Sequence, residues 1–207
     1  NMAFSNFTAS ATEAKKVPLV FVRPLMSDIE CDAVAGKKLP ATGGWIQVNV
    51  AEGGAKILAK RTTSSTYNLR DGDVDEYQDD CKFELELNIS QLDLDTLQDL
   101  VLLDPSASGA SDVVGFKANR GLKLTTKAIS VMIYDKNLDA NNVSNVPALT
   151  ADPETIVVFK AAPSSGDVPI ALDGNQGMAK LTFKCLASKS TGASGGYAGF
   201  QGKFTSL

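Results

Sequence analysis

The residues best placed to do chemistry are carboxylates, which crowd into one segment of the chain. Between positions 71 and 99 the sequence holds eleven acidic residues and a single basic one, Lys82, so this segment carries a charge of −10. Paired carboxylates can hold a cation or carry out acid–base catalysis. Three of them have the opening spacing of a calcium-binding loop: Asp71, Asp73 and Asp75. Glu76 stands where such a loop needs glycine and Lys82 where it needs glutamate, so we predict no metal ligands here.

Other reactive groups are scarce. The chain has no histidine, which removes every catalytic or metal site that depends on imidazole. Its three cysteines, Cys31, Cys81 and Cys185, are too far apart for a structural zinc site, and their odd number favours reduced thiols made in a cytoplasm. No glycine-rich phosphate-binding motif is present. We therefore predict no catalytic and no cofactor-binding residue, no cofactor, and a protein that is not an enzyme.

The acidic segment also shapes the charge distribution. The whole chain carries −4, so the residues outside positions 71–99 carry +6. A general nucleic-acid binder would show a clustered basic surface instead. A solvated acidic face is the plain interpretation. A cation site and a surface that repels an anionic partner are the functional ones.

The clearest element lies inside the acidic segment. Apolar and polar residues alternate over positions 81–89, which predicts a strand with one buried and one wet face. The pattern then changes to helical spacing, with Ser90 as a possible cap and an apolar stripe that includes Leu94, Leu97 and Val101. We therefore expect an α-helix over about 91–103.

A second alternating strand is expected near the C-terminus, over residues 178–186, where Lys180 and Lys184 lie on the polar face. With the segments of similar character, the predicted strands are 17–23, 45–50, 81–89, 113–118, 122–126, 129–134, 155–161 and 178–186. Roughly eight strands and one clear helix predict a mainly β protein, a β-sandwich or barrel with one flanking helix. No run reaches 18 consecutive apolar residues, so we expect no membrane-spanning segment.

The remaining segments define the domain organisation. Residues 27–44 carry turn signals. The polar stretch 61–80 is long for a plain loop, which favours a protruding hairpin. We predict an N-terminal arm over 1–16, one β-sandwich domain over 17–188 and a Gly/Ser-rich C-terminal arm over 189–207. Aromatic residues on flexible backbone suit contacts between subunits, although an ordinary glycine-rich final hairpin is an equal alternative. The contact candidates are Tyr67, Tyr197, Phe200 and Phe204.

The order of these features resembles a known family. A strand and a long polar excursion are followed by an alternating strand that runs into a helix (CKFELELNISQLDLDTLQDLVLL). A polar turn then leads into a lysine-bearing strand near the end (DGNQGMAKLTFKCLAS). This order resembles the tail tube, or major tail, proteins of tailed bacteriophages, over about residues 17–190.

The resemblance implies a structural virion protein made in the host bacterium's cytoplasm. Six copies would form a ring, and stacked rings would form a tube that conducts the viral DNA without binding it specifically. The excursion over 51–80 would reach the adjacent ring, and the other partners would be further tail proteins. Family tubes often have an acidic lumen, so the lumen-facing candidates are Asp71, Asp73, Asp75, Glu76, Asp79, Asp80, Glu84 and Glu86.

Elementary electrostatics is consistent with that assignment. Contacts between lysines and phosphates would hold the DNA in place, whereas acidic groups on the wall of the channel would repel the phosphates and keep the DNA away from that wall. Repulsion among the acids would be offset if Lys180 and Lys184 paired with Glu84 and Glu86 from a neighbouring strand.

Two alternatives belong to other classes. A monomeric β-sandwich binding module, such as a virion decoration or a receptor- or carbohydrate-binding domain, would bind a ligand on its loops. A carboxylate-based hydrolase or metal enzyme would need a concave site with a carboxyl group of raised pKa.

Overall fold

The computed structural model describes residues 19–38, 44–48, 50–68, 72–89, 108–110, 113–114, 121, 123–134, 155–164, 179–202 and 204. Within these residues the protein is mainly β. Eight strands form one antiparallel sheet, and a single α-helix accompanies them, which confirms the predicted fold class. The proposed arm over 1–16 and the predicted helix over 91–103 lie outside the described residues.

The main sheet is built from strands far apart in the sequence. Its order is β2–β1–β7–β8–β9–β4–β3, and β10 pairs with β8 off this path. These strands are β1 (Leu19–Pro24), β2 (Ile46–Val48), β3 (Val50–Asn68), β4 (Gly72–Ile89), β7 (Ile129–Tyr134), β8 (Thr155–Pro163), β9 (Ala179–Leu186) and β10 (Gly199–Gly202). A separate two-stranded sheet pairs β5 (Ser108–Ala110) with β6 (Val113–Val114).

The sheet folds over on itself, as a sandwich or barrel requires. Val20 of β1 and Val131 of β7 share one apolar cluster with Leu85 of β4 and Phe183 of β9, and all four side chains are buried. The opposite face of β1, β7 and β8 holds a second cluster, which includes Phe159. Both faces of the central strands are therefore covered, which explains their nearly continuous apolar sequences.

The second cluster is closed by α1 (Asp28–Ala35), whose buried residues are Cys31 and Val34. The prediction of turns over 27–44 was wrong for this segment. Ser27 and Glu30 form a capping box, in which each side chain accepts a hydrogen bond from the other residue's backbone N–H. With only two buried residues in eight, the helix has too short an apolar stripe to stand out in the sequence.

A second correction concerns residues 122–126, which were predicted as a strand. Residues Leu124–Lys127 instead form a 3₁₀ turn that leads into β7. Thr126 donates both its backbone N–H and its hydroxyl to the carbonyl of Lys123, and this local bonding replaces strand pairing.

The last two strands lie in line along one partner. β9 pairs with β8 from Pro163 to Lys160, and β10 continues along β8 from Val158 to Thr155. Residues 187–198 form a loop between them that leaves the sheet and returns, and its neck is closed by the backbone bond from Ser188 N to Tyr197 O. We call residues 187–198 the Ω-loop.

Candidate functional site

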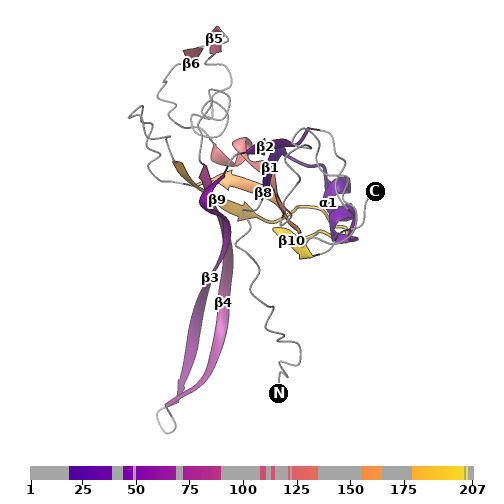
Figure 1. Cartoon of the computed structure of the whole chain (residues 1–207). Coiled ribbons are helices and arrows are strands. Elements are labelled where there is room, and N and C mark those ends of the chain that lie inside the picture. Colours follow the sequence, from indigo (N-terminus) through magenta and orange to yellow (C-terminus); the bar gives the residue numbers. More distant parts are fainter. Residues whose placement is uncertain are drawn as a thin grey trace, which may run out of the picture.

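The long excursion is a two-stranded hairpin, as its polarity predicted. Its strands β3 and β4 run side by side away from the rest of the sheet (Figure 1). Pairing continues from Ala55↔Leu87 at the base to Asn68↔Gly72 near the tip. We call residues 50–60 and 81–89 the root of the hairpin, and residues 61–68 and 72–80 its distal half.

Where its side chains are described, the distal half of the hairpin contains no buried residue. The side chains over 61–65 and 77–80 are exposed, and Tyr77 is the large aromatic among them. The ladder is interrupted by irregularities between Thr62 and Thr63 and between Thr66 and Tyr67. An isolated two-stranded hairpin is marginally stable in water, so this segment gains little from burial within one chain.

The distal half is strongly acidic. It carries one basic residue, Arg61, against five acidic ones on β4, a net charge of −4: Asp73, Asp75, Glu76, Asp79 and Asp80. Ser64 Oγ donates to Asp79 Oδ1 at 2.8 Å. Lys82 Nζ lies 2.9 Å from Asp80 Oδ2, and its hydrogen bond and positive charge lower the pKa of Asp80. Both carboxylates are exposed, so these contacts are screened by water.

The root of the hairpin carries the expected pairing of charge. β4 and β9 are neighbours, which is the condition on which the predicted charge offset depended, and Glu84 lies opposite Lys184 in the register. Glu86 Oε2 forms an ion pair with Lys180 Nζ at 3.0 Å. Glu84 instead forms its ion pair with Lys60 of β3, at 2.5 Å, a partner that the sequence did not suggest.

The outer face of this part of the sheet is basic overall. Directly opposed residues of antiparallel strands share a face, and the register places five lysines with Glu84 and Glu86: Lys56, Lys60, Lys82, Lys180 and Lys184. We call these five residues and the surface they share the lysine face. Five lysines against two glutamates give this face a net charge of +3. Lys56 and Lys184 are exposed and have no ion-pair partner within the described part of the chain.

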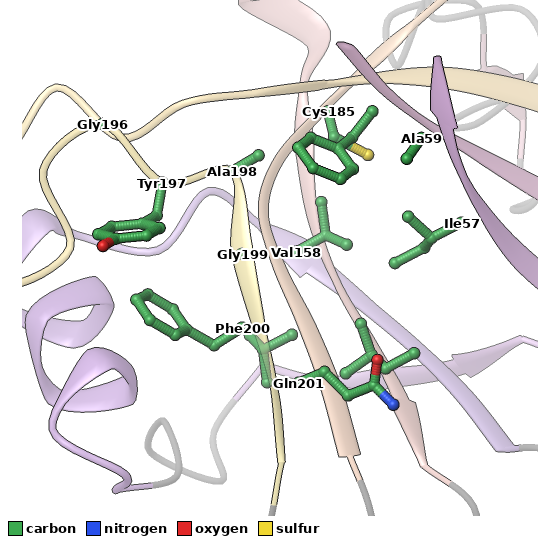
Figure 2. A pocket seen from close by; sticks show the side chains of 13 residues that line it. Ile57, Ala59, Val158, Cys185, Gly196, Tyr197, Ala198, Gly199, Phe200 and Gln201 are labelled. Atoms are coloured by element: carbon green, nitrogen blue, oxygen red, sulfur yellow. The ribbon is translucent and has the colours of Figure 1, made fainter. Parts of the chain in front are cut away.

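An apolar groove of about 420 Å³ opens between the root of the hairpin and β10. Figure 2 shows Ile57 and Ala59 of β3 on one side and Gly199 of β10 on the other. Cys185 lines the groove, where burial and, to a smaller extent, the charge of Glu84 raise the pKa of its thiol to about 12. That thiol is therefore neutral and a weak nucleophile at neutral pH.

The C-terminal aromatic residues lie beside this groove. The rings of Tyr197 and Phe200 have centroids 4.9 Å apart, and Phe200 also lies 5.7 Å from Phe159 of the second cluster. Phe200 and Phe204 are partly buried against that cluster, whereas Tyr197 is 55% exposed. Their role between subunits stays a prediction, and Tyr197 has the most ring surface left to offer a partner.

The Ω-loop is anchored to α1 through one carboxylate. Asp32 accepts hydrogen bonds from the hydroxyls of Ser190 and Ser194 and from the backbone N–H of Ser194. The two Ser194 bonds, aided by that of Ser190, lower the pKa of Asp32. A Cβ at Gly192 would lie 2.1 Å from Asp32 Oδ2, so a larger residue there would have to displace this carboxylate.

The acidic candidates thus fall into separate groups. Asp71 lies outside the described residues, and the structure places Asp73, Asp75 and Glu76 by their backbone on β4. Asp79 and Asp80 are exposed in the distal half, whereas Glu84 and Glu86 lie on the lysine face. The Asp32 anchor was missed because its partners lie 158 and 162 residues away and form no local pattern.

Within the described residues, no group of three or more histidine, cysteine or acidic residues is arranged to hold a metal ion. None of the described helices is long and apolar enough to cross a membrane. Comparison with protein-family models and with curated proteins finds no match for this sequence.

Proposed function

We propose that the protein is a structural subunit of a phage tail tube, with no catalytic activity. Six copies would form a ring, and stacked rings would conduct the viral DNA in the virion. The observation that carries this proposal is the β3–β4 hairpin. Natural proteins normally blunt or shorten exposed strand edges, and a 19-residue edge strand whose distal side chains are exposed wherever they are described is best explained by contacts with other copies.

The charge distribution supports a conduit rather than a DNA-binding protein. The segment over residues 71–99 carries −10, and those of its acidic groups that face the channel of a six-fold ring would keep the phosphates off the channel wall. Glu84 and Glu86 contribute less to such repulsion, because lysines of β3 and β9 neutralise them. The DNA would pass without sequence-specific contacts.

Electron microscopy of the purified full chain in negative stain, over a concentration series, tests the proposal. We expect rings or hollow tubes with a central channel. Small particles of uniform size at every concentration would contradict it.

The groove beside β10 favours one second candidate, a monomeric β-sandwich binding module. Its volume falls within the range of small-ligand pockets, and its lining is largely apolar. This function predicts a monomer whose melting temperature rises with a ligand bound at Ile57, Phe83 and Tyr197. Replacing Ala59 by Trp, which fills the groove, should abolish that rise while leaving the monomer folded.

A further inference from the structure

We propose that the acidic distal half of the hairpin of one copy docks on the lysine face of a second copy. This inference rests on the proposed function, because it names the surface that receives the hairpin when rings stack. It commits to a second copy of this chain as the partner. Charge, reach and directionality favour this contact.

The two surfaces are complementary in charge. The distal half carries −4 and the lysine face +3. Both Glu84 and Glu86 already have lysine partners, whereas Lys56 and Lys184 have none among the described residues. The lysine face therefore presents positive charge that its own glutamates leave unbalanced. Contacts of this kind fix which surfaces meet and speed their encounter more than they add affinity.

The hairpin can satisfy only a small part of this complementarity within its own chain. Asp80, next to the root, pairs with Lys82, but that contact leaves Lys56 and Lys184 without a partner among the described residues. The paired strands carry the other acids away from the root (Figure 1), and residues 61–68 span about 26 Å at the usual rise per residue. A continuous two-stranded ladder would have to break to fold back, so the acids nearer the tip can reach Lys56 and Lys184 only on another molecule.

The resulting contact is directional. The donor surface and the receiving surface are different parts of the chain, so the contact can be made head to tail and repeat from copy to copy. Each copy would insert its hairpin into the next and receive one from the previous, which is the geometry a stacked tube needs. Asp79 and Asp80 would then belong to the contact between copies, and the channel wall would be lined by other acids.

Charge reversal in both directions tests the inference on the full chain. In the first variant Lys56 and Lys184 become glutamate, and in the second Asp79 and Asp80 become lysine. Each should raise the protein concentration needed for assembly about tenfold, as several weakened exposed ion pairs would. The two variants mixed together should assemble near the wild-type concentration, because each supplies the partner that the other has lost. Sedimentation and electron microscopy measure both.

Matched controls separate charge from folding. A control variant with Lys123→Glu and Lys189→Glu makes the same change in net charge as the first variant. Both positions are exposed and lie off the lysine face, so assembly should stay unchanged. Circular dichroism should show all variants folded. Raising the salt concentration should weaken wild-type assembly, since screening shortens the range of exposed charges.

The outcomes distinguish the two proposals. If the wild-type chain forms neither rings nor tubes, the proposed function fails and takes this inference with it. If the wild type forms tubes but the reversals act no more strongly than the controls, only the docking assignment is wrong. Tubes that are weakened by each variant and are not restored by the mixture would overturn it as well.

Discussion

The two ends of the β3–β4 hairpin show the same pair of strands held by different forces. At the root, Leu85, Leu87 and Ile89 are fully buried and belong to the apolar cluster shared with β1 and β7. In the distal half, Thr62 lies opposite Asp80 and Ser64 opposite Tyr77, and the side chains at these positions are exposed. The root is fixed by the core of its own chain, whereas the distal half is held mainly by backbone pairing.

This difference indicates that the root contributes to the stability of the fold, whereas the distal half is available for contacts with a partner. Burying apolar side chains stabilises a fold by roughly 1.5–3 kcal/mol each, and none of the side chains described over 61–65 and 77–80 is buried. A segment that adds little to its own domain and still extends 8 residues beyond the root on β3 is suited to a partner. Changes in the root should therefore alter folding, and changes in the distal half should alter assembly.

Removing the distal half should have the largest effect, and on assembly alone. Replacing residues 62–80 by Asn-Gly joins Arg61 to Cys81, which already lie opposite each other, through a two-residue turn. We expect a chain that melts cooperatively near the wild-type temperature and forms no stacked tubes at any concentration tested. A shortened chain that still forms tubes would remove the hairpin from the contact between rings, and one that fails to fold would show that the distal half belongs to the folding unit.

Truncating one side chain in the root and one in the distal half should change the free energy of unfolding by very different amounts. Leu85→Ala should lower the free energy of unfolding by about 2–5 kcal/mol, because a fully buried leucine leaves a cavity. Tyr77→Ala, at a residue 55% exposed, should change it by about 0.5 kcal/mol or less. Urea denaturation of both variants below the assembly concentration measures this. Equal losses would mean that the core extends along the hairpin.

The root was largely predictable from the sequence. Alternation over 81–89 and 178–186 predicted two amphipathic strands, and they prove to be neighbours with Glu86 paired to Lys180. The alternation survives because one face meets a core and the other meets water. In the distal half no such constraint applies, so polarity and length predicted a hairpin but neither its register nor its bulges.

Features that depend on distant contacts were not predictable. The Ω-loop lies over α1 because Asp32 meets Ser190 and Ser194, and nothing in a glycine- and serine-rich segment indicates that partner. Likewise, Glu84 pairs with Lys60, whose place opposite Lys82 depends on the register of β3 against β4. The helix Asp28–Ala35 did carry a local signal, the Ser27–Glu30 capping box, which outweighs the turn residues that follow it.

Deleting one hydroxyl group in the buried part of the main sheet and one in the distal half should extend the comparison to single hydrogen-bonding groups. Ser130 Oγ accepts from the backbone N–H of Met26 at 2.9 Å and donates to the carbonyl of Phe159 at 2.7 Å, fully buried. Ser130→Ala leaves both backbone groups unsatisfied and should cost about 1–3 kcal/mol. Ser64→Ala removes an exposed bond to Asp79 and should cost about 0.5 kcal/mol or less. Thermal melts of the two variants that coincide would contradict this.

The smallest predicted effect concerns the Ω-loop, which is rich in glycine and serine and is anchored to α1 through the Asp32 carboxylate. The bonds from Ser194 and Ser190 hold the pKa of Asp32 below its usual 3.8 in the folded state. Asp32 therefore stabilises the fold at pH values above 3.8, and this contribution is lost as the pH falls through the lower folded-state pKa. The test compares the urea midpoints of wild type and Asp32→Asn between pH 2.5 and 6. Both proteins share all other carboxylates, so the contribution of those groups to the pH dependence drops out of the difference.

The difference between those midpoints should be largest near pH 6 and shrink below pH 3.8. Ser194→Ala removes the strongest donor and should show the same convergence with a smaller separation. A difference that stays constant across the range would mean that Asp32 holds the loop by shape alone. The Ω-loop would then resemble the distal half of the hairpin, a segment whose position does not depend on charge within its own chain.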